Sequence, residues 1–542
     1  MKNLFILVSF FISCILTAQM PDIILYNGKI FTSDSLRPYV SALAISGNKI
    51  LITGDDETVL KIKGSQTRLI NLDGRTVIPG INDAHDHPGV EYPARRFITQ
   101  QSPDGQTPWH VIRDSIRRIV KILPKGTMIR STINPDLFHD PRARRRTLDS
   151  IAPHHPILLS AWTGHGIICN SQTLKLLGYD EGTTVAGGWL EKDADNRLNG
   201  ILHEYAAYPA DVIIGKTLSP KAIEQSLRNY YLPASRWGIT STQAMATELS
   251  PKAFKRAYSE DYGLRTRVIA FPFTGKKINL DEWISFFGKL SAKNIVSGVK
   301  LIIDGTPIER LAFMSSPYAD STNYRGHLNF SDTEILEFIR FADNNNQQIM
   351  VHAVGDSAVK TFLRLLLSVH PAEYWKPKRV RIEHGDLAVM TKDDLDLFRE
   401  IGIVIVQNPS HFGLPGIMHT RLSNRTSYLQ AMKSLLSAGI PLAIGSDGPM
   451  NPYLNIMLAA IHPVNPQEAL TIEQAVTAYT LGSAFAEFEE KRKGKLAPGY
   501  LADLAVLSAD IFTLPLPQLP LIHSMLTIVD GKIILNDIIT LK

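Results

Sequence analysis

Cysteine is almost absent from this chain, and its scarcity limits how the fold can be stabilised. The 542 residues contain two cysteines, Cys14 and Cys169. Cys14 lies in an apolar N-terminal stretch that we predict to be cleaved off, so the mature chain can form no intramolecular disulfide. Stability must then come from a hydrophobic core, which a chain of this length with 44% hydrophobic residues can build.

The sequence also lacks strong net charge, internal repeats and low-complexity tracts. Its 57 Lys and Arg against 52 Asp and Glu give a formal net charge of +5. The densest basic run, residues 142–146, has no aromatic residues between its arginines, which is typical of a solvated helix start and not of a nucleic-acid surface. The composition is that of a globular protein, which excludes disordered and fibrous classes and predicts no nucleic-acid partner.

The longest apolar run of the sequence lies at the N-terminus. Lys2 precedes apolar residues 4–16, and the run ends at small residues, with a predicted cleavage near Ala18. The run is too short to form a stable membrane span. We therefore predict a signal peptide over residues 1–18 and a periplasmic or secreted protein. Lipidation at Cys14 is the less favoured alternative, because the residues around it fit a lipobox poorly.

Both ends of the mature chain show the pattern of short β-strands. "DIILYNGKIFTSD" and "SALAISGNKILITG" alternate apolar and polar residues and are broken by Asn-Gly and Gly-Asn turns, which predicts a meander of antiparallel strands. "MLTIVDGKIILND" near the C-terminus has the same pattern. We predict one small β-sandwich domain built from both termini, residues 19–79 with 495–542.

The centre of the sequence predicts an α/β fold. Apolar, β-rich runs alternate with amphipathic segments such as "TEILEFIRFADNNN", as in parallel strands covered by helices. A (β/α)8 TIM-like barrel over residues 80–494 is the simplest solution, with residues 88–237 as an insertion after strand one. The eight predicted strands are residues 76–85, 238–245, 265–271, 298–304, 347–354, 379–385, 402–410 and 441–449.

Residues that can ligate a metal follow five of these eight strands. In a TIM barrel the reactive residues lie at the carboxyl ends of the strands. Taken singly, each residue has an ordinary structural explanation, such as a salt bridge, a core histidine or a helix cap. Six such residues at one end of the predicted barrel favour a functional site over separate structural explanations. The six residues are His85, His87, Lys300, His352, His384 and Asp447.

The motifs around these residues resemble a known family. "PGINDAHDH", "VKLIIDG", "VHAVGD", "RIEHG" and "IGSDGP", in this order, are similar to motifs of the amidohydrolase superfamily, in the YtcJ-like branch that includes N-substituted formamide deformylase. The resemblance extends from about residue 22 to the C-terminus. It implies a metal-dependent hydrolase with a barrel fold.

The resemblance also implies roles for the six residues. His85, His87 and Asp447 would hold one divalent ion, Zn²⁺ or a similar metal. In two-metal members the histidines corresponding to His352 and His384 hold a second ion, and a carboxylated lysine, here Lys300, bridges both. Asp447 would accept the proton of the attacking water and pass it to the leaving amine, with His384 beside it as the second catalytic residue. Four neighbouring acidic residues would orient the ligands, namely Asp83, Asp86, Asp356 and Glu383.

The insertion should supply the substrate contacts, because it leaves the barrel directly after His87 and returns over the same rim. "GHGIICN" and "GILHEYA" are similar to segments of the YtcJ-like branch and point to His165, Asn170 and Glu204. Thr163 stands where this branch usually has an aspartate. An acidic residue that is common near Ala244 is also missing, so the substrate is less well defined than the metal site.

We predict an enzyme that hydrolyses a C–N bond of a small amide, N-formyl amine or cyclic amide. Ester or lactone hydrolysis is the alternative within this fold, because a metal-activated water attacks any comparable carbonyl. A non-catalytic periplasmic binding protein is less favoured, because every predicted ligand is present. A glycosidase is disfavoured by the lack of paired strand-end carboxylates. The oligomeric state is open, with a homodimer as one option.

Overall fold

The computed structural model describes residues 20–88, 107–247, 249–272 and 275–538. The predicted signal peptide, residues 1–18 with Cys14, lies outside this part of the chain. None of the helices in the described ranges is both long and apolar enough to cross a membrane.

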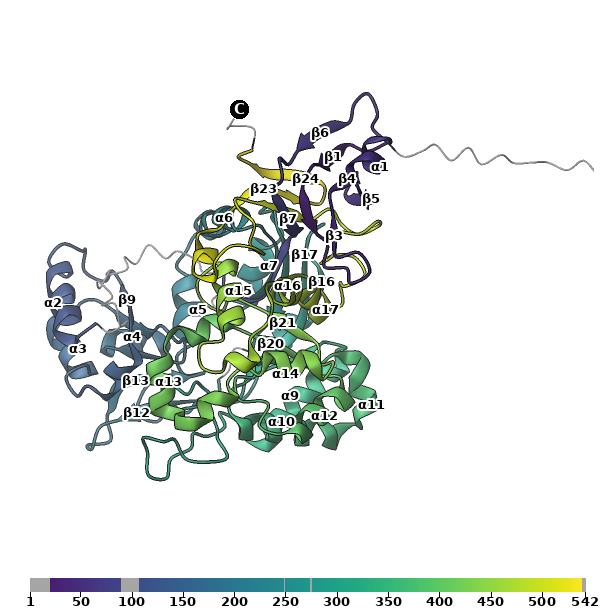
Figure 1. Cartoon of the computed structure of the whole chain (residues 1–542). Coiled ribbons are helices and arrows are strands. Elements are labelled where there is room, and N and C mark those ends of the chain that lie inside the picture. Colours follow the sequence, from purple (N-terminus) through teal and green to yellow (C-terminus); the bar gives the residue numbers. More distant parts are fainter. Residues whose placement is uncertain (1–19, 89–106, 248, 273–274, 539–542) are drawn as a thin grey trace, which may run out of the picture.

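A barrel of parallel strands forms the centre of the molecule (Figure 1). Each strand pairs in parallel with its neighbours along the sheet. The first and last strands meet where the backbone N–H of Asp447 donates to the carbonyl of His85 at 2.9 Å. The predicted α/β barrel is thus confirmed. Its strands, in order around the sheet, are β8 (Ile81–Asp86), β14 (Ile239–Met245), β15 (Arg265–Ala270), β17 (Asn294–Ile302), β18 (Ile349–Ala353), β19 (Arg381–His384), β20 (Val404–Gln407) and β21 (Leu442–Ile444).

Helices cover the outside of the barrel and bury its largest apolar core. Several of them start with a capping box, for example Ser331 with Glu334 and Thr391 with Asp394, which explains why these amphipathic runs begin where they do. The helices are α6 (Pro220–Arg236), α7 (Pro251–Ala257), α8 (Asp281–Ile284), α9 (Asp332–Asn344), α10 (Asp356–Val369), α11 (Ala372–Trp375), α12 (Lys392–Ile401), α13 (Pro415–Leu422), α14 (Met432–Ser437), α15 (Pro452–Ile461), α16 (Ile472–Thr477) and α17 (Ser483–Ala486).

Short segments complete the barrel part of the chain. A two-residue strand, β16 (Gly288–Lys289), pairs with β17. The short helical turns are η2 (Lys376–Lys378), η3 (Pro409–Gly413), η4 (Ser423–Tyr428), η5 (Pro466–Glu468), the π-helical η6 (Ala478–Gly482) and η7 (Leu516–Leu521).

The two ends of the chain form two further sheets, seen in purple and yellow at the top of Figure 1. One sheet contains N-terminal strands only, and the other combines N- and C-terminal strands. Apolar residues of both sheets share one core, which includes Leu25, Ile45, Val77, Leu504 and Leu526. In sheet order the strands are β5 (Lys49–Gly54), β4 (Ala42–Ser46), β1 (Ile23–Tyr26) and β6 (Arg68–Asn71), then β24 (Lys532–Asn536), β23 (Ser524–Val529), β22 (Leu504–Leu507), β7 (Thr76–Pro79), β2 (Lys29–Phe31) and β3 (Tyr39–Val40). Helix α1 (Asp56–Leu60) packs beside the first sheet.

The predicted antiparallel meander at the N-terminus is wrong in its pairing. β1 pairs antiparallel with β4 but parallel with β6, and β2 pairs parallel with β7. Consecutive strands β1 and β2 belong to different sheets. The turn residues mark where strands end, but partner choice depends on which apolar faces meet in the shared core.

The first predicted barrel strand, residues 76–85, is two strands in the structure. β7 belongs to the terminal sheet and β8 to the barrel, with Gly80 between them. The Gly80 N–H donates to Asp503, whereas the Ile81 N–H already donates to Gly238 beside β14. A side chain at Gly80 would overlap Thr240, since an added Cβ would lie 2.2 Å from its Oγ1. The chain therefore changes sheets at the residue that has no side chain.

The insertion between β8 and β14 contains its own mixed sheet, on the left of Figure 1. Its last helix, α6, packs into the main barrel core through residues such as Leu227 and Tyr231. The remaining elements are β9 (Ile129–Ile133), β10 (Ile157–Ala161), β11 (Gly166–Cys169), β12 (Gly188–Lys192), β13 (Leu198–Glu204), α2 (Trp109–Ile119), η1 (Pro135–His139), α3 (Arg145–Ile151), α4 (Ser171–Leu177) and α5 (Pro209–Gly215).

Candidate active site and metal centre

A cavity of about 880 Å³ lies between the carboxyl ends of the barrel strands and the insertion. All six residues predicted as metal ligands line it, as does His165 of the insertion. The cavity is large enough for a small organic molecule. The structure therefore places the predicted ligands and the predicted substrate-binding segment around one space.

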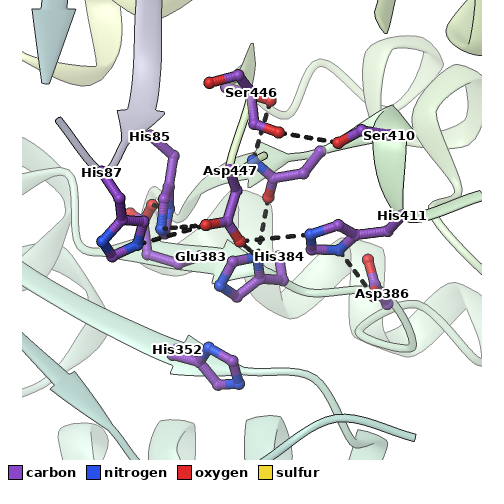
Figure 2. A network of polar contacts seen from close by, with 12 residues as sticks. His85, His87, His352, Glu383, His384, Asp386, Ser410, His411, Ser446 and Asp447 are labelled. Carbon is purple, nitrogen blue, oxygen red and sulfur yellow. Dashed lines mark hydrogen bonds and ion pairs between the residues drawn. The ribbon is translucent and has the colours of Figure 1, made fainter. Parts of the chain in front are cut away.

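Three of the predicted ligands form a compact group. One ligand atom each of His85, His384 and Asp447 lies within 4.8 Å of the others. His87 adjoins this group, with its Nε2 3.3 Å from Oδ1 of Asp447 (Figure 2). Imidazole nitrogens and a carboxylate are the ligand types that Zn²⁺ and similar divalent ions prefer. The donor atoms present thus fit a metal centre.

Hydrogen bonds on the far side of each ring orient these histidines. Nδ1 of His85 lies 2.6 Å from Glu383, and Nδ1 of His384 lies 2.8 Å from Oδ1 of Asn408. The amide group of Asn408 donates to the Gly445 carbonyl, so its oxygen is the atom that accepts from His384. With the ring proton on Nδ1, the lone pair of each histidine is on Nε2, the nitrogen that can then bind a metal. The tautomers implied by these partners are those a metal site needs.

Electrostatics keep His85 neutral. Burial of its ring, together with the neighbouring Lys300, lowers the pKa of His85 to about 4. Burial alone would raise the pKa of Glu383, but the Arg381 guanidinium and His85 hold that pKa far below its usual range. Arg381 donates to both oxygens of Glu383, at 2.8 and 3.1 Å. An ionised Glu383 can therefore hold the proton of His85 Nδ1 in place.

Lys300 lies directly beside the group. Its Nζ is 2.9 Å from Nε2 of His85, and burial of the side chain lowers its pKa to about 8. An ammonium carries no lone pair for a metal, so Lys300 can act as a ligand only as a neutral amine or a carbamate. Lys300 thus adjoins the compact group through His85 but is outside it.

His352 stands apart from the other ligands (Figure 2). Its ring centre is 4.4 Å from that of His384 and 5.0 Å from that of His165. Burial and the adjacent His384 hold the pKa of His352 well below its usual value, so the ring is neutral. Its Nε2 is buried and, among the described residues, has no hydrogen-bond partner. A buried ring nitrogen left open in this way fits a metal ligand.

Asp447 lies at the centre of the network in Figure 2. Its φ of 38° is unusual for a residue other than glycine, and such backbone conformations are often found at functional sites. Burial alone would raise its pKa, but His85 and the hydrogen-bonding His411 and His87 hold the pKa of Asp447 well below its usual range. The carboxylate is therefore ionised and can accept a proton.

A model of the amidohydrolase family matches residues 68–535, which is most of the chain. The chain belongs to the amidohydrolase family. The resemblance seen in the sequence motifs is confirmed.

Individual relatives match this amidohydrolase over nearly their whole length. YtcJ of Bacillus subtilis strain 168 is 27% identical over 94% of this chain and 98% of its own. The N-substituted formamide deformylase of Arthrobacter pascens is 25% identical over 95% of this chain and 98% of its own. The structure of an uncharacterized metal-dependent hydrolase from Pyrococcus horikoshii OT3 superposes with a TM-score of 0.70, at 22% identity, over 91% of this chain and 99% of that one.

His165 and Glu204 of the amidohydrolase form a buried pair on the insertion side of the cavity. Nδ1 of His165 lies 2.9 Å from Glu204 Oε1, and Tyr208 donates to the other carboxylate oxygen at 3.5 Å. Burial would lower the pKa of His165, but the Glu204 carboxylate raises it to about 9. His165 lines the cavity directly, whereas Glu204 is behind it. A protonated His165 can thus donate from its other nitrogen to a bound molecule.

Asn170 does not reach the cavity, in contrast to its predicted role as a substrate contact. Its side-chain oxygen accepts from the backbone N–H groups of Ile157 and Thr173, and its amide donates to the carbonyl of His155 at 2.8 Å. Asn170 caps helix α4 and ties it to β10. This end of the motif therefore serves to build the insertion, whereas His165 at its other end lines the cavity.

Replacing Asn170 with alanine should therefore affect stability and not turnover. Losing the cap and leaving buried backbone groups unpaired should lower the free energy of unfolding by about 2–4 kcal/mol. Denaturant unfolding measures this effect, and kcat per metal-loaded molecule should stay unchanged at low temperature. Gln172→Ala is the control, because this exposed neighbour makes one bond to Pro153. A loss of kcat without a loss of stability would support the original prediction that Asn170 contacts the substrate.

The four acidic residues predicted to orient the ligands have different roles. Asp83 accepts from the backbone N–H groups of His85 and Ser446 and so joins the two loops that carry the ligands. Glu383 holds His85, as described above. Asp86 faces away from the metal group and accepts from Thr242 at 2.7 Å. Asp356 accepts from the Ser315 backbone at 2.9 Å and so holds a loop, whereas Asp86 ties β8 to the neighbouring strand β14.

Several residues of the site were not predicted from the sequence. His411 and Asp386 contact Asp447 or its neighbours, and Asn408 holds His384. Asp304 lies 3.9 Å from His352 and accepts three backbone N–H groups, at Phe313, Val354 and Gly355. The one available signal was their position at or just after the end of a predicted strand, in "IID", "EHGD" and "QNPSH".

Thr163, the position where the YtcJ-like branch usually has an aspartate, contacts a carboxylate from another loop. Its hydroxyl donates to Glu309, which also accepts from Thr306. Thr163 belongs to the insertion, and Glu309 follows barrel strand β17. The contact connects the two walls of the cavity. An acidic group is thus present next to position 163, although it comes from residue 309.

Proposed function

We propose that this amidohydrolase uses a divalent metal to hydrolyse a C–N bond of a small amide, N-formyl amine or cyclic amide. The observation that carries the proposal is the convergence of His85, His384 and Asp447 within 4.8 Å at the base of a cavity. The name of the deformylase relative, which matches over nearly its whole length, supports a C–N substrate.

The residues that would hold the metal are those of the compact group with His87, and His352 and Lys300 would complete a second position. We propose Zn²⁺ as the resident ion, because imidazole and carboxylate ligands suit it. When bound, the ion supplies a Lewis acid that polarises a carbonyl and makes water acidic near neutral pH. A second ion requires Lys300 as a carbamate or neutral amine, as its position 2.9 Å from His85 allows.

Asp447 is the group best placed to move a proton. Its ionised carboxylate faces the cavity with 21% of the side chain exposed and contacts His87 and His384. It can accept the proton of the attacking water and deliver it to the leaving nitrogen. Nδ1 of His384 lies 3.5 Å from the second oxygen. His165, on the opposite side of the cavity, can donate to a substrate oxygen.

Two other functions use the same residues. An ester or lactone hydrolase needs the same attack on a carbonyl but no proton transfer to a nitrogen leaving group. A binding protein without catalysis would need the ligands without the base. Asp447 is present, ionised and largely buried, and this favours a catalytic protein over a protein that only binds its ligand.

The test is metal analysis of the purified protein followed by a substrate screen. N-formyl amines, N-acyl amines, cyclic amides, esters and lactones of matched size should be compared at equal concentration. We expect bound divalent metal, turnover of an amide class above the esters, and loss of turnover on chelation that is reversed by adding the metal. Preferential ester or lactone turnover would support the alternative, and metal-loaded protein without any turnover would support the binding protein.

We further propose that the chain is exported and begins near Gln19 once the signal is removed. The support is Lys2 followed by the apolar run of residues 4–16. N-terminal sequencing of protein from the native host should find a start near residue 19 outside the cytoplasm. A retained Met1, or a lipid on Cys14, would contradict this proposal.

A further inference from the structure

One histidine of the cavity has no place in the predicted metal site. His411 lies in η3, directly after strand β20, and lines the cavity. Its Nε2 is 3.3 Å from Oδ2 of Asp447, and its Nδ1 is 3.6 Å from Oδ2 of Asp386. The ring thus bridges two carboxylates, as Figure 2 shows.

The two oxygens of Asp447 face different partners. Oδ1 lies 3.3 Å from Nε2 of His87 and 3.7 Å from Nε2 of His85, the nitrogens available for a metal. Oδ2 faces His411 and, at 3.5 Å, Nδ1 of His384. The His384 proton is already directed to Asn408, at 2.8 Å. Among the described contacts, His411 is therefore the ring best placed to donate to Oδ2 without being a predicted metal ligand.

Both ends of this contact are anchored to the surrounding structure. The residue before His411, Ser410, donates from its hydroxyl to the Ser446 carbonyl and from its backbone to Asn455. The backbone N–H of Asp447 donates to His85 at 2.9 Å. On the other side, Asp386 accepts from the Gln430 amide at 3.0 Å. His411 is held between two fixed loops and cannot readily turn away from Asp447.

We propose that His411 is a positioning residue that holds Oδ2 of Asp447, with Asp386 fixing the ring, so that Oδ1 keeps one orientation toward His85 and His87. The inference rests on the proposed function in taking Asp447 as the base. A base displaced by about 1 Å can cost on the order of 100-fold in rate, so a contact that prevents rotation of the carboxylate has a measurable effect.

Three variants separate this role from a general structural role. His411→Ala removes the donor, His411→Gln retains an amide N–H near the place of Nε2, and His523→Ala removes an exposed histidine of the terminal β domain. Each is loaded with Co²⁺ for an absorption spectrum and with the native metal for kcat and KM on the best amide substrate. Metal content and the unfolding midpoint are measured on the same samples.

We expect His411→Ala to lower kcat by about 10- to 100-fold at full metal content, with a much smaller change in KM. The Co²⁺ spectrum should change in this variant, because the carboxylate beside the ion is free to rotate. His411→Gln should recover most of the kcat and the native spectrum, and His523→Ala should match the native protein. Native kcat and spectrum in His411→Ala would overturn the inference, as would a Gln variant no better than Ala.

A double-mutant cycle tests the part played by Asp386. If Asp386 acts through His411, Asp386→Asn should lower kcat in the native background but add little to His411→Ala. Independent, additive losses of kcat would show that Asp386 does not act through His411.

The Co²⁺ spectra can be measured without any substrate turnover. If no amide is hydrolysed but the spectra follow the expected pattern, the proposed function fails while the positioning role of His411 stands.

Discussion

Replacing Asp447 with asparagine is expected to lower kcat by about 10²–10⁴-fold while KM changes far less. Asparagine keeps the size of the side chain and one oxygen, but it cannot accept a proton from water. The predicted substrate contact at His165 comes from the insertion and is unaltered by the change. The measurement is kcat, KM and metal content on the same sample.

The control for Asp447→Asn is Asp332→Asn, which neutralises an exposed aspartate paired with Arg364 on the outer surface. It should leave kcat and metal content unchanged. Full turnover in Asp447→Asn would show that another group is the base. A proportional loss of metal and kcat would show that Asp447 acts mainly as a ligand.

The second large effect is expected from His85→Ala, which should lose metal and activity together. Mutating a residue that only hydrogen-bonds to a metal ligand typically lowers metal affinity or activity by roughly 10–100-fold. Removing the ligand His85 itself should lower them by more. His85 is fully buried and bonded to Glu383 at 2.6 Å. The change therefore also leaves a buried carboxylate short of a partner, at a cost of about 1–3 kcal/mol in the free energy of unfolding.

His87→Ala is the matched comparison, because His87 is a predicted ligand of the same strand end with 32% of its side chain exposed. It should lower metal content and activity with little change in stability. Elemental analysis and denaturant unfolding of both variants test the two expectations separately. Unchanged metal stoichiometry in both variants would show that neither histidine at the end of strand β8 is a metal ligand.

The barrel could be predicted from the sequence because its signal is local. Each barrel strand is a short apolar run, and the amphipathic segments between the strands carry their own caps at Ser331 and Thr391. Since parallel strands in a barrel all end at the same rim, the residues that follow them had to lie near one another. The strand ends therefore predict His85, His384 and Asp447 at one rim, and in the structure a ligand atom of each lies within 4.8 Å of the others.

The same local patterns gave a wrong strand where the terminal sheet and the barrel sheet meet. Residues 76–85 were predicted as one strand, because apolar residues continue on both sides of Gly80. The break depends on how closely Thr240 approaches Gly80 from the neighbouring strand. For Asn170 the sequence showed a polar residue near the predicted cavity, but not that buried backbone groups at Ile157 and His155 would use its whole hydrogen-bonding capacity.

Periodicity and residue type were thus sufficient to predict the barrel and the strand ends that carry the candidate ligands, and the motifs at these strand ends resembled the family to which the chain belongs. The tautomers of the histidines, the break at Gly80 and the contact of His411 with Asp447 required the folded chain. His85 and its partner Glu383 are 298 residues apart in the sequence, and no local pattern relates them. A strand's apolar pattern shows where it ends, whereas the hydrogen-bond partners of a buried side chain depend on which distant segments pack beside it.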